Sequence, residues 1–439
     1  MRATRKKKLG FITLGCQMNK HDSEWIAGVL SDTHEVTEEH SQADLLVINT
    51  CAVRDKAEQK FSSLLGRLRP LKKQNQKMII GVAGCVAQEH GEALAKKEPM
   101  VDMVFGPRTI SKVPEMLLRF EQTGKTQVDV SDHGGFDDYP MARQSSVSAW
   151  VSIMQGCDNF CSYCIVPYAR GRERSRPADS IVSEVSRLAA EGFVEITLLG
   201  QNVNSYGKGL PEETDFPRLL ARINAIEGIR RIRFVTSHPK DLSRGLVDAM
   251  ADLEKVCPSL HLPLQSGSGR ILKLMNRGYT AEEYFEKVDL LRSRVPGMAL
   301  TSDIIVGFPG ETEEDFQMTV DALERVRYDN IFLFKYSPRP GTAATKLTDP
   351  EVDKVAVGER FTQLMENQNA ISRQIYEVWV GRQVEILVEG PSRNNPSKGS
   401  GRTKENLMVH FMSDNDYTGK FIRVSINHAG RFFLEGQLA

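Results

Sequence analysis

Three closely spaced cysteines carry the clearest chemical signal in this sequence. They lie in the segment Gly156-Cys157-Asp-Asn-Phe-Cys161-Ser-Tyr-Cys164, a C-x3-C-x2-C arrangement directly after a predicted strand. Thiolates this close together can ligate three irons of one cubane cluster and leave the fourth iron open to another ligand. A tetrahedral zinc site would need a fourth protein ligand, and no His or Cys lies nearby in sequence to supply it. The triplet therefore predicts a four-iron (4Fe-4S) cluster with an open iron.

Three further cysteines are distant in sequence but occupy equivalent places. Cys16, Cys51 and Cys85 each directly follow a predicted strand. Because the carboxyl ends of successive strands lie along one edge of a parallel doubly wound sheet, these thiols are expected to converge and to hold a second open-sited cluster. The alternative is three unrelated buried thiols. The seventh cysteine, Cys257, is interpreted as a core or turn residue without a function.

Repeated βα units are predicted to position these cysteines. Residues 8–122 alternate apolar runs with amphipathic segments, which indicates an N-terminal doubly wound parallel α/β domain. Residues 149–374 contain six more units and predict a central partial (β/α)6 barrel, with its chemistry at the C-terminal ends of the strands. The predicted barrel strands are 150–154, 194–199, 232–236, 260–264, 300–306 and 331–336.

The remaining segments differ in pattern from the βα units. Residues 123–148 are polar and are predicted to be a linker with one strand near 126–130. A helix is expected over 351–374, and then β-branched alternation in 375–439 predicts a small C-terminal β-barrel. In that barrel, residues 391–406 are predicted to be a basic hairpin loop.

Composition restricts the function classes. The 439 residues contain 57 Lys+Arg and 57 Asp+Glu, a formal net charge of zero, which excludes a histone-like mode and confines any nucleic-acid binding to local basic patches. The basic N-terminus is followed by too short an apolar run for a signal peptide, and no apolar run approaches the roughly 18 residues of a membrane span. A cytoplasmic protein with reduced thiols and no membrane partner is expected.

The cysteine triplet followed by a βα barrel resembles the radical S-adenosylmethionine (SAM) enzymes. The resemblance implies that the methionine amino and carboxylate groups of SAM chelate the open iron, and that an electron from the cluster cleaves the sulfonium to give a 5′-deoxyadenosyl radical. It also implies the remaining SAM or substrate contacts, which lie beside the third cysteine and in polar segments after the strands. These cofactor-binding residues are Tyr163 near adenine, Gln201 and Asn202 at the methionine moiety, and Ser237, Gln265 and Asp303 at ribose or substrate.

The three domains together resemble the methylthiotransferases over nearly the whole chain. The resemblance implies an auxiliary 4Fe-4S cluster on Cys16, Cys51 and Cys85 that carries the sulfur or methylthio group, and a radical-generating cluster on Cys157, Cys161 and Cys164. All six cysteines would be both metal ligands and catalytic residues. Two SAM molecules would be used per turnover, one as methyl donor and one as radical source. Replacing an unactivated C–H bond needs such chemistry, because general acid–base catalysis has no leaving group to act on.

The C-terminal segment resembles TRAM, a small RNA-binding barrel. Arginine clusters suit phosphate contacts, although polar loops are often only exposed. The predicted RNA-binding residues are Arg170, Arg172, Arg174, Arg176, Arg393, Lys398, Arg402 and Lys404.

Within the methylthiotransferases, the segments GCDNFCSYCIVPYARGRERSR and NTCAVRDKAEQK most resemble the bacterial enzymes that methylthiolate N6-isopentenyladenosine at position 37 of tRNA, in the anticodon stem-loop. Alternatives are threonylcarbamoyl-adenosine of tRNA, an aspartate of a ribosomal protein, or a non-catalytic zinc-stabilised RNA-binding module. The resemblance further implies a monomer, an electron donor such as a flavodoxin or ferredoxin, and a sulfur donor that the sequence does not identify.

Overall fold

A computed structural model describes residues 5–51, 55–132 and 141–439. The described residues fall into two compact units. The first contains the chain up to Gln144 together with Gln155–Asp158 and Cys164–Glu173, and the second contains Ser145–Met154, Asn159–Tyr163 and Arg174–Ala439. Over the described part of the chain, no helix is both long and apolar enough to cross a bilayer.

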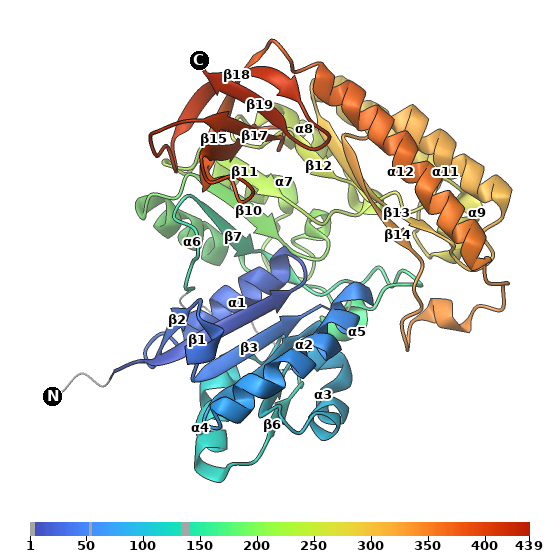
Figure 1. Ribbon diagram of the computed structural model, residues 1–439. Coiled ribbons are helices and arrows are strands. Elements are labelled where there is room, and N and C mark those ends of the chain that lie inside the picture. Colours follow the sequence, from blue (N-terminus) through green and yellow to red (C-terminus); the bar gives the residue numbers. More distant parts are fainter. Residues whose placement is uncertain (1–4, 52–54, 133–140) are drawn as a thin grey trace. The chain divides into compact units, whose positions relative to one another are not determined.

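The first unit is built on a six-stranded parallel sheet (Figure 1). The strands are β1 (Lys7–Leu14), β2 (His34–Thr37), β3 (Leu45–Thr50), β4 (Ile79–Gly84), β5 (Met103–Phe105) and β6 (Gln127–Asp129), in the order β2-β1-β3-β4-β5-β6. The strand order reverses between β1 and β3, which is where doubly wound folds place their ligands. The predicted doubly wound domain is confirmed.

Helices cover both faces of this sheet, because its apolar side chains alternate between two cores. The helices are α1 (Gln17–Val29), α2 (Asp55–Gln74), α3 (Cys85–Lys97), α4 (Val113–Thr123) and the short α5 (Val166–Ala169). Trp25 and Ile26 of α1 pack with Met116 of α4 in one cluster. Phe61 of α2 packs in the other cluster with α3 and with Ala169 of α5. The segment that follows the C-x3-C-x2-C motif therefore packs in the first unit.

The second unit contains the predicted partial barrel. Its strands are β7 (Ser148–Ser152), β10 (Glu195–Leu199), β11 (Arg231–Phe234), β12 (Ser259–His261), β13 (Ala299–Val306) and β14 (Asn330–Lys335). They form two three-stranded parallel sheets, β7-β10-β11 and β12-β13-β14. A parallel bridge between Ile232 and Val256 links the β11 region to the segment before β12. The starts and ends of the six strands all lie within three residues of the predicted bounds.

Amphipathic helices cover the outside of these strands (Figure 1). They are α6 (Ala178–Ala190), α7 (Phe216–Asn224), α8 (Arg244–Asp252), α9 (Gly269–Leu274), α10 (Ala281–Arg294) and α11 (Glu313–Val326). Thr280 and Thr312 begin α10 and α11 with reciprocal capping boxes, in which the hydroxyl accepts from the third helical N–H. The short strands β8 (Met154–Gln155) and β9 (Arg174–Ser175) flank the cysteine motif.

A long helix, α12 (Lys354–Glu377), leads into a closed five-stranded barrel. Its strands are β15 (Gln383–Pro391), β16 (Lys398–Arg402), β17 (Met408–Met412), β18 (Phe421–Ala429) and β19 (Leu434–Leu438), in the order β15-β16-β17-β19-β18. Ile386, Val409 and Leu434 are among the residues that fill its interior. The predicted helix and small barrel are both present.

Two expectations differ from the structure. The strand predicted within the linker is present as β6. It is not part of a linker, however, because it pairs in parallel with β5 and forms the edge of the N-terminal sheet. The predicted hairpin loop 391–406 contains β16, because the segment Lys398-Gly-Ser-Gly-Arg402 pairs along β15 and β17. Glycines 399 and 401 leave this strand without an apolar pattern, and Gly401 lies so close to β15 that a Cβ would approach the Leu387 carbonyl oxygen to 2.4 Å.

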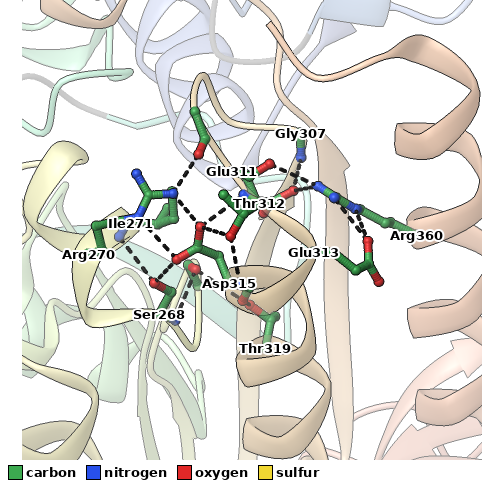
Figure 2. Close-up of polar contacts among 12 residues, drawn as sticks. Ser268, Arg270, Ile271, Gly307, Glu311, Thr312, Glu313, Asp315, Thr319 and Arg360 are labelled. Atoms are coloured by element: carbon green, nitrogen blue, oxygen red, sulfur yellow. Dashed lines mark hydrogen bonds and ion pairs between the residues drawn. The ribbon is translucent and has the colours of Figure 1, made fainter. Parts of the chain in front are cut away.

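A buried polar network fixes the start of α11 against α9 and α12 (Figure 2). Asp315 accepts hydrogen bonds from Ser268 Oγ at 2.5 Å and from Thr312 Oγ1 at 2.7 Å, and it forms an ion pair with Arg270. On the other side, Arg360 of α12 donates to Glu311 Oε2 at 2.8 Å. Burial opposes the charged form of Asp315, but these hydrogen bonds outweigh it and lower the pKa of that carboxyl.

Replacing Asp315 with Asn is expected to destabilise the protein by about 2 kcal/mol near neutral pH, because charge-assisted hydrogen bonds lose one partner's charge. Since the pKa is lower in the folded state, the carboxylate contributes stability above the unfolded value of about 3.9, and that contribution is lost as the pH falls below it. Urea unfolding of wild type and variant at several pH values should show the difference shrinking towards acid. Asp321→Asn, at an exposed position of the same helix, is the control, and an equal loss in both variants would contradict the prediction.

Candidate iron–sulfur and SAM sites

Cys16, Cys51 and Cys85 follow three adjacent parallel strands of the first unit. Cys16 caps α1 after β1, Cys51 directly follows β3, and Cys85 is the first residue of α3 after β4. The paired registers of β1 with β3 and of β3 with β4 bring the three strand ends to one edge. Cys51 and Cys85 are only 1% and 3% exposed. The structure thus brings the three dispersed cysteines to one edge of the sheet.

A buried amide network ties the first two cysteine loops together. Asn19 Nδ2 donates to Asn49 Oδ1 at 3.0 Å and to the Thr50 carbonyl at 3.1 Å, and Asn49 Nδ2 donates back to the Asn19 carbonyl at 2.7 Å. The Cys16 backbone N–H donates to Asn19 Oδ1 at 3.2 Å. Buried networks whose members are paired hold a single geometry. The end of β3 is therefore held against the start of α1.

Two glycines allow the cysteine loops to approach each other. A Cβ on Gly15 would lie 2.8 Å from the Cys51 Cβ and 2.2 Å from Asn19 Oδ1. Gly84 has a φ of 89° and a Cβ there would lie 2.3 Å from the Thr50 carbonyl oxygen. Only glycine fits where a positive φ and such close backbone contacts coincide.

The three thiols differ in their electrostatic surroundings. A hydrogen bond with Cys51, opposed by burial and assisted by the charge of Arg170, lowers the pKa of Cys16 to about 5. Burial raises the pKa of Cys85, although Arg170 opposes that shift through its charge and a hydrogen bond. Cys16 is accordingly a thiolate at neutral pH, the form that binds metals.

The C-x3-C-x2-C motif occupies the loop between β8 and α5. Gly156 has a φ of 76°, and a Cβ there would lie 2.0 Å from the Arg172 carbonyl oxygen. The next residue, Cys157, donates its backbone N–H to the Gly171 carbonyl at 3.1 Å. All seven cysteines of the chain lie in the described residues, and none forms a disulfide.

Two buried side chains that the sequence did not single out contact the middle cysteine of the motif. Arg277 Nη1 donates to Cys161 Sγ and to the Tyr163 hydroxyl, each at 3.3 Å, and Nη2 donates to the Pro263 carbonyl at 2.8 Å. His238 Nε2 lies 3.9 Å from Cys161 Sγ. Burial, with Arg277 nearby, lowers the pKa of His238 to about 2, so the ring is neutral. Cys161 therefore lies beside one cation and one neutral ring.

The strand ends of the partial barrel carry buried acceptors. Asn202 donates Nδ2 to Asp241 Oδ2 at 2.6 Å, and its Oδ1 is buried without a hydrogen-bond partner among the described residues. The same is true of Gln265 Oε1. Gln265 has a φ of 75° and Thr236 a φ of 68°, both in the left-handed region that these residues rarely adopt. Such strain and unpaired polar atoms gather at ligand sites.

The remaining predicted SAM contacts are spread along the same strands. Ser237 hydrogen-bonds the His261 carbonyl, and Asp303 Oδ1 lies 3.5 Å from His261 Nε2, within β13 and not at its end. Tyr163 is half-buried and packs beside the cluster of Ile271 and Phe308. Gln201 is half-buried directly before Asn202. Cys257, for which no function was predicted, is buried and donates its N–H to the Ile232 carbonyl at 2.9 Å.

Two of the predicted RNA contacts need correction. Arg170 is 4% exposed and paired with Asp22, and Arg176 is 8% exposed and paired with Glu184. Their guanidinium groups are engaged inside the protein and are not displayed to a phosphate. Arg172 and Arg174 are exposed, and Arg172 Nε donates to Asp158 Oδ1 at 2.7 Å.

The predicted RNA contacts of the small barrel lie at its surface. Arg393 is exposed, Lys404 is half-buried, Lys398 pairs with Glu435 at 2.7 Å and Arg402 with Glu389 at 3.0 Å. A cavity of about 280 Å³ lies beside Lys398. Lys398, Asn415, Asp416 and Tyr417 are among its lining residues.

Two buried arginines, which the sequence also did not reveal, fasten the small barrel to β11. Arg231 Nη1 donates to the Arg402 carbonyl at 2.6 Å. Arg233 donates to the Thr403 carbonyl at 2.7 Å, to the Lys404 carbonyl at 2.9 Å and to Glu195 Oε2 at 2.9 Å. The carbonyls of the small barrel lie about 170 residues away in sequence, so no local sequence pattern predicts these contacts.

Models of three protein families match segments of this chain. "Radical SAM superfamily" matches residues 151–323, "TRAM domain" matches residues 377–439, and "Uncharacterized protein family UPF0004" matches residues 8–106. The fold is similar to that of the radical SAM methyltransferase TsrM from Kitasatospora setae, with a TM-score of 0.56 and 16% identity over 86% of this chain and 76% of that one. The match over residues 151–323, which include the cysteine loop, identifies a radical SAM domain in this chain.

Relatives that match nearly the whole chain identify a family within the radical SAM proteins. A protein of Acetivibrio thermocellus named tRNA-2-methylthio-N(6)-dimethylallyladenosine synthase is 50% identical over 99% of this chain and 92% of its own length. A protein of Moorella thermoacetica with the same name is 45% identical over 99% of this chain and 98% of its own length. The chain belongs to the family of the tRNA-2-methylthio-N(6)-dimethylallyladenosine synthases.

The radical SAM family implies a 4Fe-4S cluster and SAM, and the residues present fit both. Cys161 has a cationic hydrogen-bond donor on its sulfur, as the hydrogen bonds that tune cluster sulfurs require. The unpaired oxygens of Asn202 and Gln265 fit the ammonium and hydroxyl donors of SAM. Among the described residues, no group of three or more His, Cys, Asp or Glu side chains is arranged so that it could hold a single metal ion.

Proposed function

We propose that this chain methylthiolates N6-isopentenyladenosine at position 37 of tRNA, as the names of its full-length relatives indicate for those proteins. The observation that carries the proposal is the meeting of Cys16, Cys51 and Cys85 at one edge of the N-terminal sheet, in a chain that also has the radical SAM motif. One cysteine triplet would serve radical generation alone. A second, separate triplet supports the insertion of sulfur as well.

Cys157, Cys161 and Cys164 would hold the radical SAM cluster, and Cys16, Cys51 and Cys85 would hold an auxiliary 4Fe-4S cluster. Such clusters, with SAM, supply the radical chemistry that functionalises an unactivated C–H bond, with a second SAM as methyl donor. The chain's own residues orient these groups. Arg277 holds the sulfur of Cys161 and the hydroxyl of Tyr163, while Asn202 and Gln265 offer acceptors at the strand ends.

The TRAM barrel would bind the anticodon stem-loop. Arg393 and Lys404 supply charge. The cavity beside Lys398 is lined by an aromatic ring, an amide and a carboxylate, which suits contacts with an unpaired nucleotide. A cytoplasmic monomer that receives electrons from a flavodoxin or ferredoxin fits this assignment.

The direct test is nucleoside analysis of tRNA from a strain that lacks this gene. Accumulation of N6-isopentenyladenosine, reversed by the wild-type gene, is the expected result. An unchanged nucleoside profile would contradict the proposal and direct attention to a protein acceptor. Loss of a methylthio group from threonylcarbamoyl-adenosine would instead identify that nucleoside as the substrate.

Replacing both Arg393 and Lys404 with Gln is expected to weaken binding of the anticodon stem-loop for all sequences alike. The slope of log affinity against log salt should become shallower by roughly 2, because about one counterion is released per phosphate contact. Fluorescence anisotropy at several salt concentrations measures both quantities. A double variant of Arg69 and Arg119, exposed arginines of the first unit, is the charge-matched control, and an equal change in slope there would contradict the prediction.

A further inference from the structure

The buried ion pair between Arg170 and Asp22 lies at the auxiliary cysteine site. Asp22 belongs to α1, which Cys16 caps, and Arg170 follows α5 six residues after Cys164. Arg170 Nη2 donates to Asp22 Oδ2 at 2.6 Å and Nη1 to Asp22 Oδ1 at 3.4 Å. Both residues belong to the first unit, and they are 4% and 2% exposed. This two-point contact fixes the plane of the guanidinium.

Arg170 also reaches the cysteines themselves. Ala169, the residue before Arg170, packs in the same buried cluster as Cys85. The charge of Arg170 lowers the pKa of Cys16 and opposes the burial that raises the pKa of Cys85. Burial opposes the charge of Arg170, but Asp22 and Cys85 outweigh it and raise the pKa of the guanidinium well above its ordinary value. A permanent cation is thus held in the part of the first unit where Cys85 is buried.

Stability alone does not account for this pair. Desolvating two charges costs several kcal/mol per ion, and a buried pair is often no more stabilising than apolar side chains of similar volume. The reduction potential of an iron–sulfur cluster, by contrast, depends on local charge and on hydrogen bonds to its sulfurs.

We propose that Arg170 is a positioning residue that sets the charge at the auxiliary site, donating to the sulfur of Cys85 while Asp22 holds and partly neutralises its guanidinium. The proposal rests on the proposed function, since it requires a cluster on Cys16, Cys51 and Cys85. Removing the cation disfavours the more negative, reduced state and lowers the potential. Removing the carboxylate leaves the cation uncompensated and raises it.

The test uses the full-length chain with Cys157, Cys161 and Cys164 replaced by Ala, so that only the auxiliary cluster remains. After anaerobic reconstitution, the reduction potential is measured by electron paramagnetic resonance at poised potentials. Arg170→Met is expected to shift the potential down, and Asp22→Asn to shift it up. Arg172→Met, which removes an exposed arginine two residues away, should leave it unchanged.

The proposal predicts that the reduction potential shifts in opposite directions in the two variants. A merely structural ion pair would give no shift, or shifts of one sign together with loss of iron. No shift, or shifts of the same sign, would overturn the proposal. Arg170→Lys is the second variant, for the case in which Arg170→Met folds poorly. Because lysine keeps the positive charge, this variant should retain iron and have a reduction potential near that of the parent protein. Loss of iron in the lysine variant as well would show that the ion pair is structural. A parent protein that binds no iron would instead refute the auxiliary site itself.

Discussion

Replacing Cys51 with Ala is expected to stop methylthiolation while SAM cleavage continues at a rate close to that of wild type, whereas Cys157→Ala is expected to abolish both. Cys51 is buried in the first unit beside Cys16, and alanine removes its sulfur without adding volume. Cys157 lies in the radical SAM loop, where its loss removes one of three iron ligands. The two substitutions should therefore separate sulfur insertion from radical formation.

Two measurements check this separation. Liquid chromatography with mass spectrometry quantifies 5′-deoxyadenosine and the methylthiolated nucleoside, and iron analysis should fall from about eight to about four atoms per chain in either variant. Cys257→Ala is a matched control, because Cys257 is equally buried and no cluster is assigned to it. A Cys51→Ala enzyme that still methylthiolates, or a Cys257→Ala enzyme that does not, would show that the assignment of cysteines to the two clusters is wrong.

Arg277→Met should reduce SAM cleavage by roughly 10- to 100-fold, the usual cost of removing a side chain that orients a metal ligand. The guanidinium holds Cys161, Tyr163 and the Pro263 carbonyl at once, so its loss removes the cationic donor that orients the Cys161 sulfur. Methionine has a similar length and no charge, which keeps the packing.

The measurement is 5′-deoxyadenosine formation with dithionite as reductant, alongside the spectrum of the reconstituted cluster. We expect an altered reduction potential for the radical SAM cluster as well as slower cleavage. Lys273→Met, at an exposed position of α9, is the control. Wild-type cleavage in the Arg277 variant would mean that the contact with Cys161 has no part in orienting the cluster ligand.

Much of the architecture could be predicted because it depends on local patterns. Apolar strands followed by amphipathic helices indicated the N-terminal domain and the six barrel units. The place of Cys16, Cys51 and Cys85 after parallel strands was enough to predict that they lie along one edge of the sheet. β16 escaped prediction, because Gly399 and Gly401 give it no apolar alternation and only its neighbours make it a strand.

Burial of charged residues could not be predicted in the same way. Arg170 and Arg176 stand in a basic segment that locally resembles a phosphate-binding surface. Their carboxylate partners, Asp22 and Glu184, come from elements whose approach depends on the fold. Arg277 likewise carries no local signal for its contact with Cys161, 116 residues away.

The anchoring of the small barrel has a consequence for how its surface can change. Arg231 and Arg233 bind it mainly through the backbone carbonyls of residues 402, 403 and 404, which every amino acid possesses. The side chains of that stretch can therefore be exchanged without removing the acceptors that secure it. In the proposed function Arg402 and Lys404 contact RNA, so substitutions there would change recognition and leave the attachment of the barrel intact.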